Sequence, residues 1–383
     1  MQLSQIKILK ESKVRTVVSR ALQHQRLGHA YLLYGPDGSG KEALALSMAQ
    51  SFLCPNRTGA GASASLFGEE PHEHWACGTC SNCRRVCELM HPDVHVVMPR
   101  ASTAKEAEIG EVLQSYGRQP FHRNRPWENS FILIDDIRAL KKTLAVTSYE
   151  GSGAVVLLLE AQRLKAESAN ALLKILEEPP PATHFVLTAT SMESLLPTIV
   201  SRCQPLATPV LAQTVIASFL QEYQQIEPKR TAFIAKICNN NLRHALALVE
   251  ENLEGTRNVA IEFLRMAFKF NRPLEQMDFL QQLLSERERQ ELQTLLKFCQ
   301  LWIRDAYVLK ACGENQQAEE LIINTDFRNA LVDLNKNLPD FDFDRVLTAI
   351  EFAIECLERH VQPWLVLMVL LHRIRQHARG VKS

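Results

Sequence analysis

The sequence predicts an α/β core with a parallel sheet, followed by an all-helical remainder. Up to about residue 205, short apolar strands alternate with amphipathic helices, the pattern of a parallel sheet covered by helices. A glycine-rich segment, Gly35–Lys41, follows the first of these strands and precedes a helix. After Pro205 no comparable strand recurs, and apolar residues have helical spacing.

The predicted elements divide the chain into three parts. We expect four buried strands and, later, helices in two segments of clear helical spacing; the strands are Ala30–Tyr34, Val94–Met98, Val155–Leu159 and Phe185–Ala189, and the helical segments are Thr214–Tyr223 and Val259–Phe268. Breaks near Asn239–Asn241 and Glu254–Gly255 separate a small helical unit from a larger one. The expected domains are 1–205, 206–252 and 253–383.

Length and composition exclude several classes of protein. The 383 residues suffice for two or three domains, and the 43 basic and 43 acidic residues cancel, so any nucleic-acid contact must be local. The longest apolar run, Trp364–Leu371, is far shorter than the roughly 20 residues that span a bilayer. The first residues show no secretory signal, so we expect a cytoplasmic protein. Thr58–Ser65, rich in Gly, Ala and Ser, is expected to be a flexible loop.

The segment Gly35–Lys41 has the features of a phosphate-binding loop. Gly35, Gly38 and Gly40 let backbone N–H groups face phosphates at a helix N-terminus, where Lys41 would add its charge. The next residue should be a Ser or Thr that binds magnesium, but it is Glu42. The residues leave two interpretations open, a loop that binds ATP or ADP and a loop that only packs.

Hydrolysis would also need an acidic pair at the end of a neighbouring strand. Asp135 and Asp136 are followed by apolar residues at helical spacing, which favours Asp135 as the N-cap of a helix. The better strand, Val155–Leu159, ends in Glu160 and Ala161 and so keeps only one acid. The two changes, at 42 and at 161, together argue against ATP hydrolysis.

Closely spaced cysteines predict a metal site. Two residues separate Cys77 from Cys80 and Cys80 from Cys83, a spacing that lets thiolates converge on one ion. The fourth ligand is Cys54, which would close a structural zinc site, or Cys87, which would complete a run like that of bacterial ferredoxins. Weaker candidates are His72, His74 and His91. Because no second such cysteine run exists, zinc is favoured over an iron–sulfur cluster, and Cys203, Cys238, Cys299, Cys312 and Cys356 are expected in the core.

Several motifs in this order resemble one family. They are Arg26–Tyr31, the glycine-rich loop, the cysteines followed by His91-Pro-Asp93, Ser168–Pro180 and Ser201-Arg202-Cys203. The chain is similar in these residues to bacterial clamp loaders of the AAA+ class, and specifically to the delta-prime family of DNA polymerase III. The resemblance covers residues 1 to about 205.

The resemblance implies an AAA+ core with a zinc-binding insertion at about 54–90, a helical lid and a C-terminal collar domain. It implies that Arg202 acts in trans as an arginine finger, because a guanidinium stays protonated and stabilises charge on a transferred phosphoryl group. Arg243, in Asn241–Leu246, resembles the second sensor of the lid. The implied partners are gamma or tau and delta subunits in a pentameric ring, and through it the sliding clamp and primed DNA.

The motifs and the resemblance lead to two functional hypotheses of different classes. The first is a scaffold subunit of the DNA polymerase III holoenzyme that completes its neighbour's ATPase site and is not an ATPase on its own. The alternative is an ATP-hydrolysing motor subunit like gamma or tau, favoured by Gly35–Lys41 and Arg243. A metal-containing nucleic-acid module acting alone is disfavoured by the balanced charge, although Lys165 and Lys174 could face phosphates inside a ring.

Overall fold

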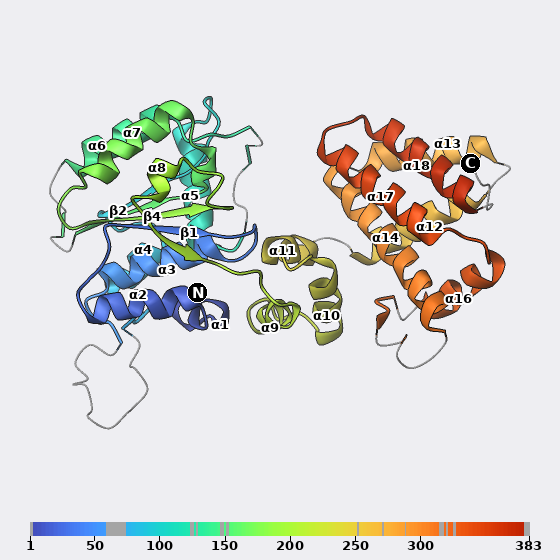
Figure 1. Cartoon of the computed structure of the whole chain (residues 1–383), viewed down its shortest axis with the longest axis horizontal. Coiled ribbons are helices and arrows are strands. Elements are labelled where there is room, and N and C mark those ends of the chain that lie inside the picture. The colour runs from blue at the N-terminus through green and yellow to red at the C-terminus, as the bar shows by residue number, and fades with distance from the viewer. Residues whose placement is uncertain are drawn as a thin grey trace, which may run out of the picture. The chain divides into compact units, whose positions relative to one another are not determined.

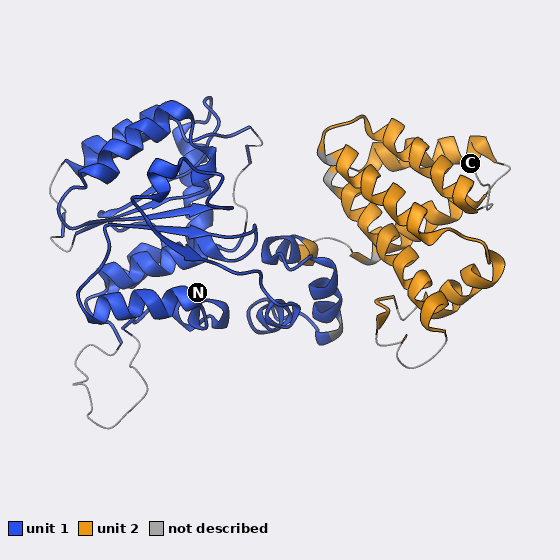
Figure 2. Ribbon diagram, in the orientation of Figure 1, with its two compact units in different colours: residues 1–247 blue, residues 248–383 orange. Residues whose placement is uncertain are grey.

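The computed structural model describes residues 3–58, 74–122, 126–127, 129–145, 149–150, 153–250, 253–269, 272–287, 289–313, 318, 321–324 and 327–378. The chain forms two compact units, 1–247 and 248–383 (Figure 2). Most of the predicted flexible loop after Thr58, and His72, lie outside the described residues. In the described residues, none of the helices has the length and apolar character needed to span a membrane.

The first unit is built on a parallel sheet of five strands. Its order is β2-β3-β4-β1-β5, with bounds Ala30–Tyr34 for β1, Val94–Val97 for β2, Ala154–Leu158 for β3, Thr183–Ala189 for β4 and Gln204–Ala207 for β5. Strands β1 and β3 are almost wholly buried, as expected for continuous apolar runs with helices on both faces. The four predicted strands are confirmed to within two residues, and β5 was not predicted.

Helices cover both faces of this sheet (Figure 1). One face packs against α6 and α7, and their Leu140, Leu172 and Ile175 share a buried core with Val156 and Leu187 of the sheet. The other face is covered by α3, all of whose residues are buried. The elements before the lid are η1 Leu3–Gln5, α1 Lys7–Lys10, α2 Lys13–Gln23, α3 Lys41–Leu53, α4 Ser81–Cys87, α5 Glu106–Arg118, α6 Ile134–Leu144, η2 Ala161–Arg163, α7 Ala166–Glu177 and α8 Pro197–Val200.

Three further helices follow the sheet: α9 Gln213–Gln224, α10 Pro228–Ile237 and α11 Leu242–Glu250. The turn between the last two contains Asn239 and Asn240, both with positive φ, at the break that the sequence predicts there. The boundary between the compact units falls inside α11, after Ala247, so these helices group with the core. A lid distinct from the core, at 206–252, remains a prediction.

The described residues of the second unit form helices joined by turns, with no strand among them, as predicted for the C-terminal part. They are α12 Leu253–Phe268, α13 Pro273–Glu286, α14 Arg289–Cys312, α16 Arg328–Asn337, α17 Phe343–Glu358 and α18 Pro363–Ala378. Helix α14 packs against α12, α16 and α17. The break predicted near Glu254–Gly255 lies just after the boundary between α11, which ends at Glu250, and α12, which begins at Leu253 and includes both residues.

Two of the cysteines expected in the core are placed differently. Cys203, Cys238 and Cys299 are buried, but Cys312 is exposed at the end of α14 and Cys356 is half-buried. Helical spacing identifies the helix that carries a cysteine, but a residue in the last turn of a helix has little of the partner surface needed to bury it. The expectation that Cys312 lies in the core is therefore wrong.

Candidate functional site

The glycine-rich loop connects β1 to α3, as predicted. Gly38 and Gly40 have φ of +72° and +80°, values that side chains rarely allow, and Gly40 precedes the first residue of α3. A Cβ at Gly35 would lie 2.1 Å from the carbonyl oxygen of Thr208, so the loop also needs glycine for close approach. The loop thus keeps the backbone form that would place N–H groups at a helix N-terminus.

The two residues after the last glycine are buried charges. The Lys41 and Glu42 side chains are 1% and 6% exposed, and their Nζ and Oε1 atoms lie 3.7 Å apart. Lys41 Nζ also donates a hydrogen bond to the carbonyl oxygen of Pro36 at 3.0 Å. The lysine that would hold phosphates therefore has its own partners within the loop and the first turn of α3.

Arg243 reaches the loop from α11, where the predicted second sensor lies. Its Nη2 is 3.1 Å from Glu42 Oε2, and its Nη1 pairs with Asp37. Burial opposes the charge of this guanidinium, but Glu42 and Asp37 outweigh that effect and raise the pKa of Arg243. The structure brings together Gly35, Gly38, Gly40, Lys41 and Arg243, and adds Asp37, which the sequence did not single out.

The strand that should carry the catalytic acids ends without a pair. After β3, Glu160 adopts φ +52°, its backbone N–H donates to Thr188 Oγ1 at 2.9 Å, and its carboxylate lies 3.3 Å from Arg163 Nε. Ala161 is 1% exposed and offers only a methyl group. The group that would orient a water molecule for attack is therefore lacking at this position.

Asp135 and Asp136 lie in a helix, as the spacing predicts, but Asp135 is not its N-cap. Helix α6 begins at Ile134, and the carboxylate of Asp136 accepts the N–H of Leu133 at 3.1 Å and pairs with Arg100 at 2.8 Å. Asp135 is exposed and pairs with Arg138. The capping role belongs to the residue that follows Asp135, because its position in the first turn lets its side chain reach back to the start of the helix.

The four cysteines Cys54, Cys77, Cys80 and Cys83 converge in the structure. All four Sγ atoms lie within 4.8 Å of one another, with Cys54 3.6 Å from Cys77 and 3.9 Å from Cys80. A tetrahedral site with Zn–S bonds of about 2.3 Å places its sulfurs about 3.8 Å apart, so the set fits zinc. Backbone N–H groups of Cys77, Cys80 and Cys83 also point at neighbouring sulfurs, at 3.4–3.5 Å.

Cys87 and the histidines lie outside this set. Cys87 Sγ accepts a hydrogen bond from Gln50 Nε2 at 2.9 Å, and burial raises the pKa of the Cys87 thiol to about 11. His91 Nε2 faces Glu150 at 3.3 Å, and His74 is not one of the converging residues. Within the cluster the hydrogen bond with Cys83 lowers the pKa of Cys54 to about 5, while that bond and burial raise the pKa of Cys83. The geometry selects Cys54 between the two open candidates.

Arg202 is partly exposed on the turn between α8 and β5, with 33% of its side chain accessible. Its Nη2 lies 2.8 Å from Glu177 Oε1 at the end of α7, and its Nη1 donates to the carbonyl oxygen of Thr198 at 2.9 Å. None of these partners belongs to the glycine-rich loop of the chain itself. Cys203 is 7% exposed, and burial raises its pKa to about 12, so it packs and is not an activated thiol.

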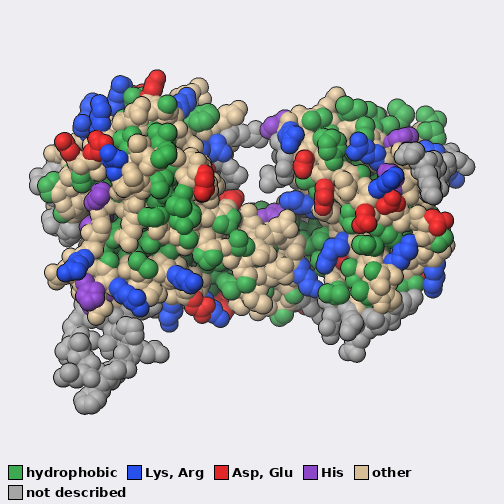
Figure 3. Space-filling model, viewed as in Figure 1, with side chains coloured by type: hydrophobic (Ala, Val, Ile, Leu, Met, Phe, Trp, Pro, Cys, Tyr) green, Lys and Arg blue, Asp and Glu red, His purple; other side chains and the backbone are tan. Residues whose placement is uncertain are grey.

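Charge is mixed on the visible surface. In Figure 3, basic and acidic side chains are interspersed over both units. Lys165 Nζ lies over the Phe131 ring, 5.1 Å from its centroid, and Lys174 is exposed on α7. Nothing in this arrangement singles out either lysine as a phosphate contact.

Comparison with known proteins decides the family. The profile of the family described as "DNA polymerase III, delta subunit" matches residues 10–211, more than half of the chain. The chain belongs to this family. Among its relatives, the subunit delta' of Bacillus subtilis is 30% identical over 248 residues (65% of this chain and 60% of the relative). That of Haemophilus influenzae is 26% identical over 331 residues, covering 86% and 83%.

Other subunits of the same polymerase are also similar to the chain. The subunit tau of Escherichia coli is 27% identical over 249 residues, covering 64% of this chain and 32% of that protein. A solved DNA polymerase III gamma subunit-related protein from Thermotoga maritima covers 99% of the chain with 16% identity and a TM-score of 0.39. The family match and the relatives named delta' agree with the resemblance of the motifs.

Proposed function

We propose that the chain is a clamp-loader subunit that does not hydrolyse ATP and supplies Arg202 in trans to the ATPase site of a neighbouring gamma or tau subunit. The observation that carries the proposal is the placement of Arg202. The guanidinium is partly exposed, and its ion pair and hydrogen bonds are made with Glu177, Thr198 and Ser201, all outside the glycine-rich loop. A partly exposed, permanently charged group on a turn is suited to a phosphate bound by another subunit.

The chain's own loop supports the non-hydrolysing part of the proposal. Glu42 stands where magnesium would need a hydroxyl, and Ala161 stands where an acid would orient water. The backbone around both residues has the form expected of a nucleotide-binding core. The loop leads into α3 beside Glu42, and β3, which ends before Ala161, pairs with β4. The residues at 42 and 161 therefore lack the groups needed for ATP hydrolysis, while the fold around them is retained.

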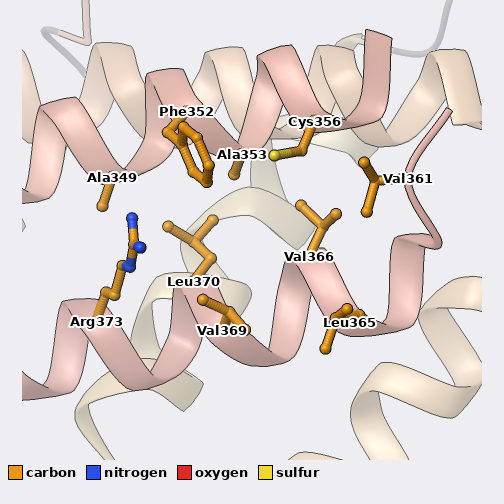
Figure 4. A pocket seen from close by; sticks show the side chains of 10 residues that line it. All are labelled: Ala349, Phe352, Ala353, Cys356, Val361, Leu365, Val366, Val369, Leu370 and Arg373. Carbon is orange, nitrogen blue, oxygen red and sulfur yellow. The ribbon is translucent and has the colours of Figure 1, made fainter. Parts of the chain in front are cut away.

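The second unit supports a role in assembly. An apolar groove between α17 and α18 is lined by Phe352, Cys356, Leu365 and Val369 among others (Figure 4). The Phe352 and Leu365 residues are 51% and 54% exposed, and Arg373 lies over the Phe352 ring at 5.2 Å. We assign to this unit the collar role, in which helices of gamma, tau or delta subunits pack in a pentameric ring that loads the sliding clamp onto primed DNA.

The experiment mixes this chain with the gamma or tau and delta subunits of its own organism and measures assembly and ATP turnover. We expect the chain alone to show no turnover above background and the assembly to be active. Arg202→Ala should leave assembly intact and slow turnover at one site by roughly 10- to 1000-fold. Arg138→Ala, which removes another exposed arginine with an acidic partner, is the control. Unchanged turnover at that site with Arg202→Ala would reject the proposal.

The alternative, a gamma- or tau-like motor, is supported by the tau relatives and by the retained Lys41. It predicts turnover by the purified chain that Lys41→Ala abolishes. Such turnover would replace the first proposal.

A further inference from the structure

The cations of the glycine-rich loop face a carboxylate that belongs to the chain itself. Glu42 lies between two positive groups, with Oε1 3.7 Å from Lys41 Nζ and Oε2 3.1 Å from Arg243 Nη2. The side chains of Lys41, Glu42 and Arg243 are only 1%, 6% and 12% exposed. Charges buried to this degree need partners, and Glu42 is a partner of both cations, beside the Pro36 carbonyl for Lys41 and Asp37 for Arg243.

The carboxylate of Glu42 lies among groups that would attract a phosphate. A loop that holds a nucleotide directs a lysine and the N-terminus of the following helix at phosphate oxygens. Here Lys41 begins α3, and Glu42 lies in its first turn, where a negative charge is favoured by the helix dipole. Arg243 adds a second cation from another helix. One carboxylate thus lies beside two cations and in the first turn of α3, the features that would attract a phosphate, and its Oε1 is buried with no hydrogen-bond partner among the described residues.

The same contacts join the loop to α11. Besides the Glu42 pair, Arg243 binds Asp37, and the backbone N–H of Leu242 donates to the carbonyl oxygen of Gly38 at 3.1 Å. A Cβ at Gly38 would lie 1.9 Å from Asn241 Oδ1, which shows how closely the turn before α11 approaches the loop. Helix α11 is therefore held on the loop by both charged and backbone contacts.

We propose that Glu42 is a built-in anionic ligand of the glycine-rich loop, which takes the place of a nucleotide phosphate and holds α11 closed on the loop without nucleotide. This inference deepens the proposed function, on which it rests, because it gives the reason that the loop stays shut. It makes a specific claim about one residue: the carboxylate of Glu42 is the anion that Lys41 and Arg243 bind in place of a phosphate.

The test uses the isolated full-length chain, so it does not depend on Arg202 or on any partner. Binding of Mg·ATP is measured by calorimetry and by the shift that ATP causes in the melting temperature. The wild-type chain should show no binding up to about 1 mM and no shift. Glu42→Thr, which removes the carboxylate and supplies the missing hydroxyl, should bind Mg·ATP at least tenfold more tightly and melt at a higher temperature when ATP is added. Glu42→Thr combined with Lys41→Met should lose this gain.

A second variant keeps the test decisive if Glu42→Thr fails to fold. Glu42→Gln keeps the size of the side chain and removes its charge, which leaves the buried Lys41 without its carboxylate partner and removes one of the two acidic partners of Arg243. We expect its melting temperature to fall by roughly 5–15 °C and to be partly restored by inorganic triphosphate, which should not stabilise the wild type. Wild-type binding of ATP as tight as that of the variants, or folded variants that gain no affinity for either anion, would overturn the inference. Neither result would bear on Arg202, whose role is tested in the assembly.

Discussion

Arg202 and Glu177 form an ion pair, 2.8 Å between Nη2 and Oε1, that joins the turn after α8 to the end of α7. Their side chains are 33% and 48% exposed, so the pair is solvated and contributes little to stability, about 0–1 kcal/mol. If Arg202 serves a neighbour's phosphate, Glu177 must release it when the neighbour docks. The pair then sets the resting position of the guanidinium in the separate subunit.

Glu177→Gln tests this relationship. Removal of the competing negative charge should leave the unfolding free energy unchanged within about 1 kcal/mol and should retain, or raise by about two- to fivefold, ATP turnover in the assembly. Glu178→Gln removes the same charge one residue away and is the control. A loss of turnover with Glu177→Gln as large as that with Arg202→Ala would mean that Glu177 positions the arginine for reaction.

The cysteine cluster predicts one zinc ion per chain. Cys83→Ser should lose the metal and lower the melting temperature by several degrees, because Cys83 is buried at the point where the insertion meets α3. Cys87→Ser, which changes a cysteine outside the converging set, should keep the metal. Metal content by atomic emission after dialysis distinguishes the two, and loss of zinc from Cys87→Ser but not from Cys54→Ser would contradict the assignment of the fourth ligand.

The surroundings of two glycines, Gly38 in the loop and Gly110 in α5, predict opposite effects of substitution by alanine on stability. Gly38→Ala should destabilise the chain by about 1–3 kcal/mol, because its φ is +72° and a Cβ would collide with Asn241. Gly110→Ala should stabilise it by about 0.5–1 kcal/mol, since Gly110 lies inside α5 with no atom within 4 Å of the added Cβ. Urea unfolding of both variants gives the measurement, and equal effects would show that the close approach at Gly38 does not exist in solution.

A buried histidine predicts a pH dependence of stability. His91 is 2% exposed, and burial lowers its pKa below the ordinary 6.5, although Glu150 acts in the opposite direction. Below pH 6.5 the unfolded chain takes up a proton at this residue that the folded chain does not. The unfolding free energy should therefore fall as the pH falls from about 7 through this range, until the pH is below both pKa values.

His91→Asn should reduce this fall, because an asparagine oxygen can still accept the N–H of Asp93, as the imidazole does at 3.2 Å, without titrating. The dependence should not vanish, since burial lowers the pKa of His95 and His184 as well. The measurement is urea unfolding at pH 7.5 and 5.5, with His360→Asn, an exposed histidine of the second unit, as control. An equal pH dependence of the unfolding free energy in wild type and His91→Asn would show that His91 does not contribute to it.

The core strands were predictable because a strand buried on both faces needs a continuous apolar run, as in Ala154–Leu158. Strand β5 lies at the edge of the sheet and pairs with β1 only, and three of its four residues are exposed, so it needs no such run. The break near Gly255 was placed slightly too late in the chain, because packing of α12, which begins at Leu253, outweighs the low helix propensity of one glycine.

The motifs indicated Lys41, Arg202 and the cysteines as candidates, and of these the structure brings the four cysteines together. Asp37 and Glu177 lie within two of the motifs, but they were not singled out because each pairs with a residue distant in sequence, Arg243 and Arg202. Lone acids in a loop or at a helix end carry no spacing that would indicate such a partner. The choice of Cys54 over Cys87 likewise required the fold, because α3 brings Cys54 back to the insertion.

The central claim is that Arg202 acts on a phosphate bound by another subunit. Its most direct test is single-turnover hydrolysis of ATP at the neighbouring site in the reconstituted assembly, comparing wild type with Arg202→Lys. Lysine keeps the positive charge but cannot form the planar pair of hydrogen bonds. We predict a rate lower by roughly 10-fold or more with assembly unchanged. An equal rate in the two assemblies would contradict the account.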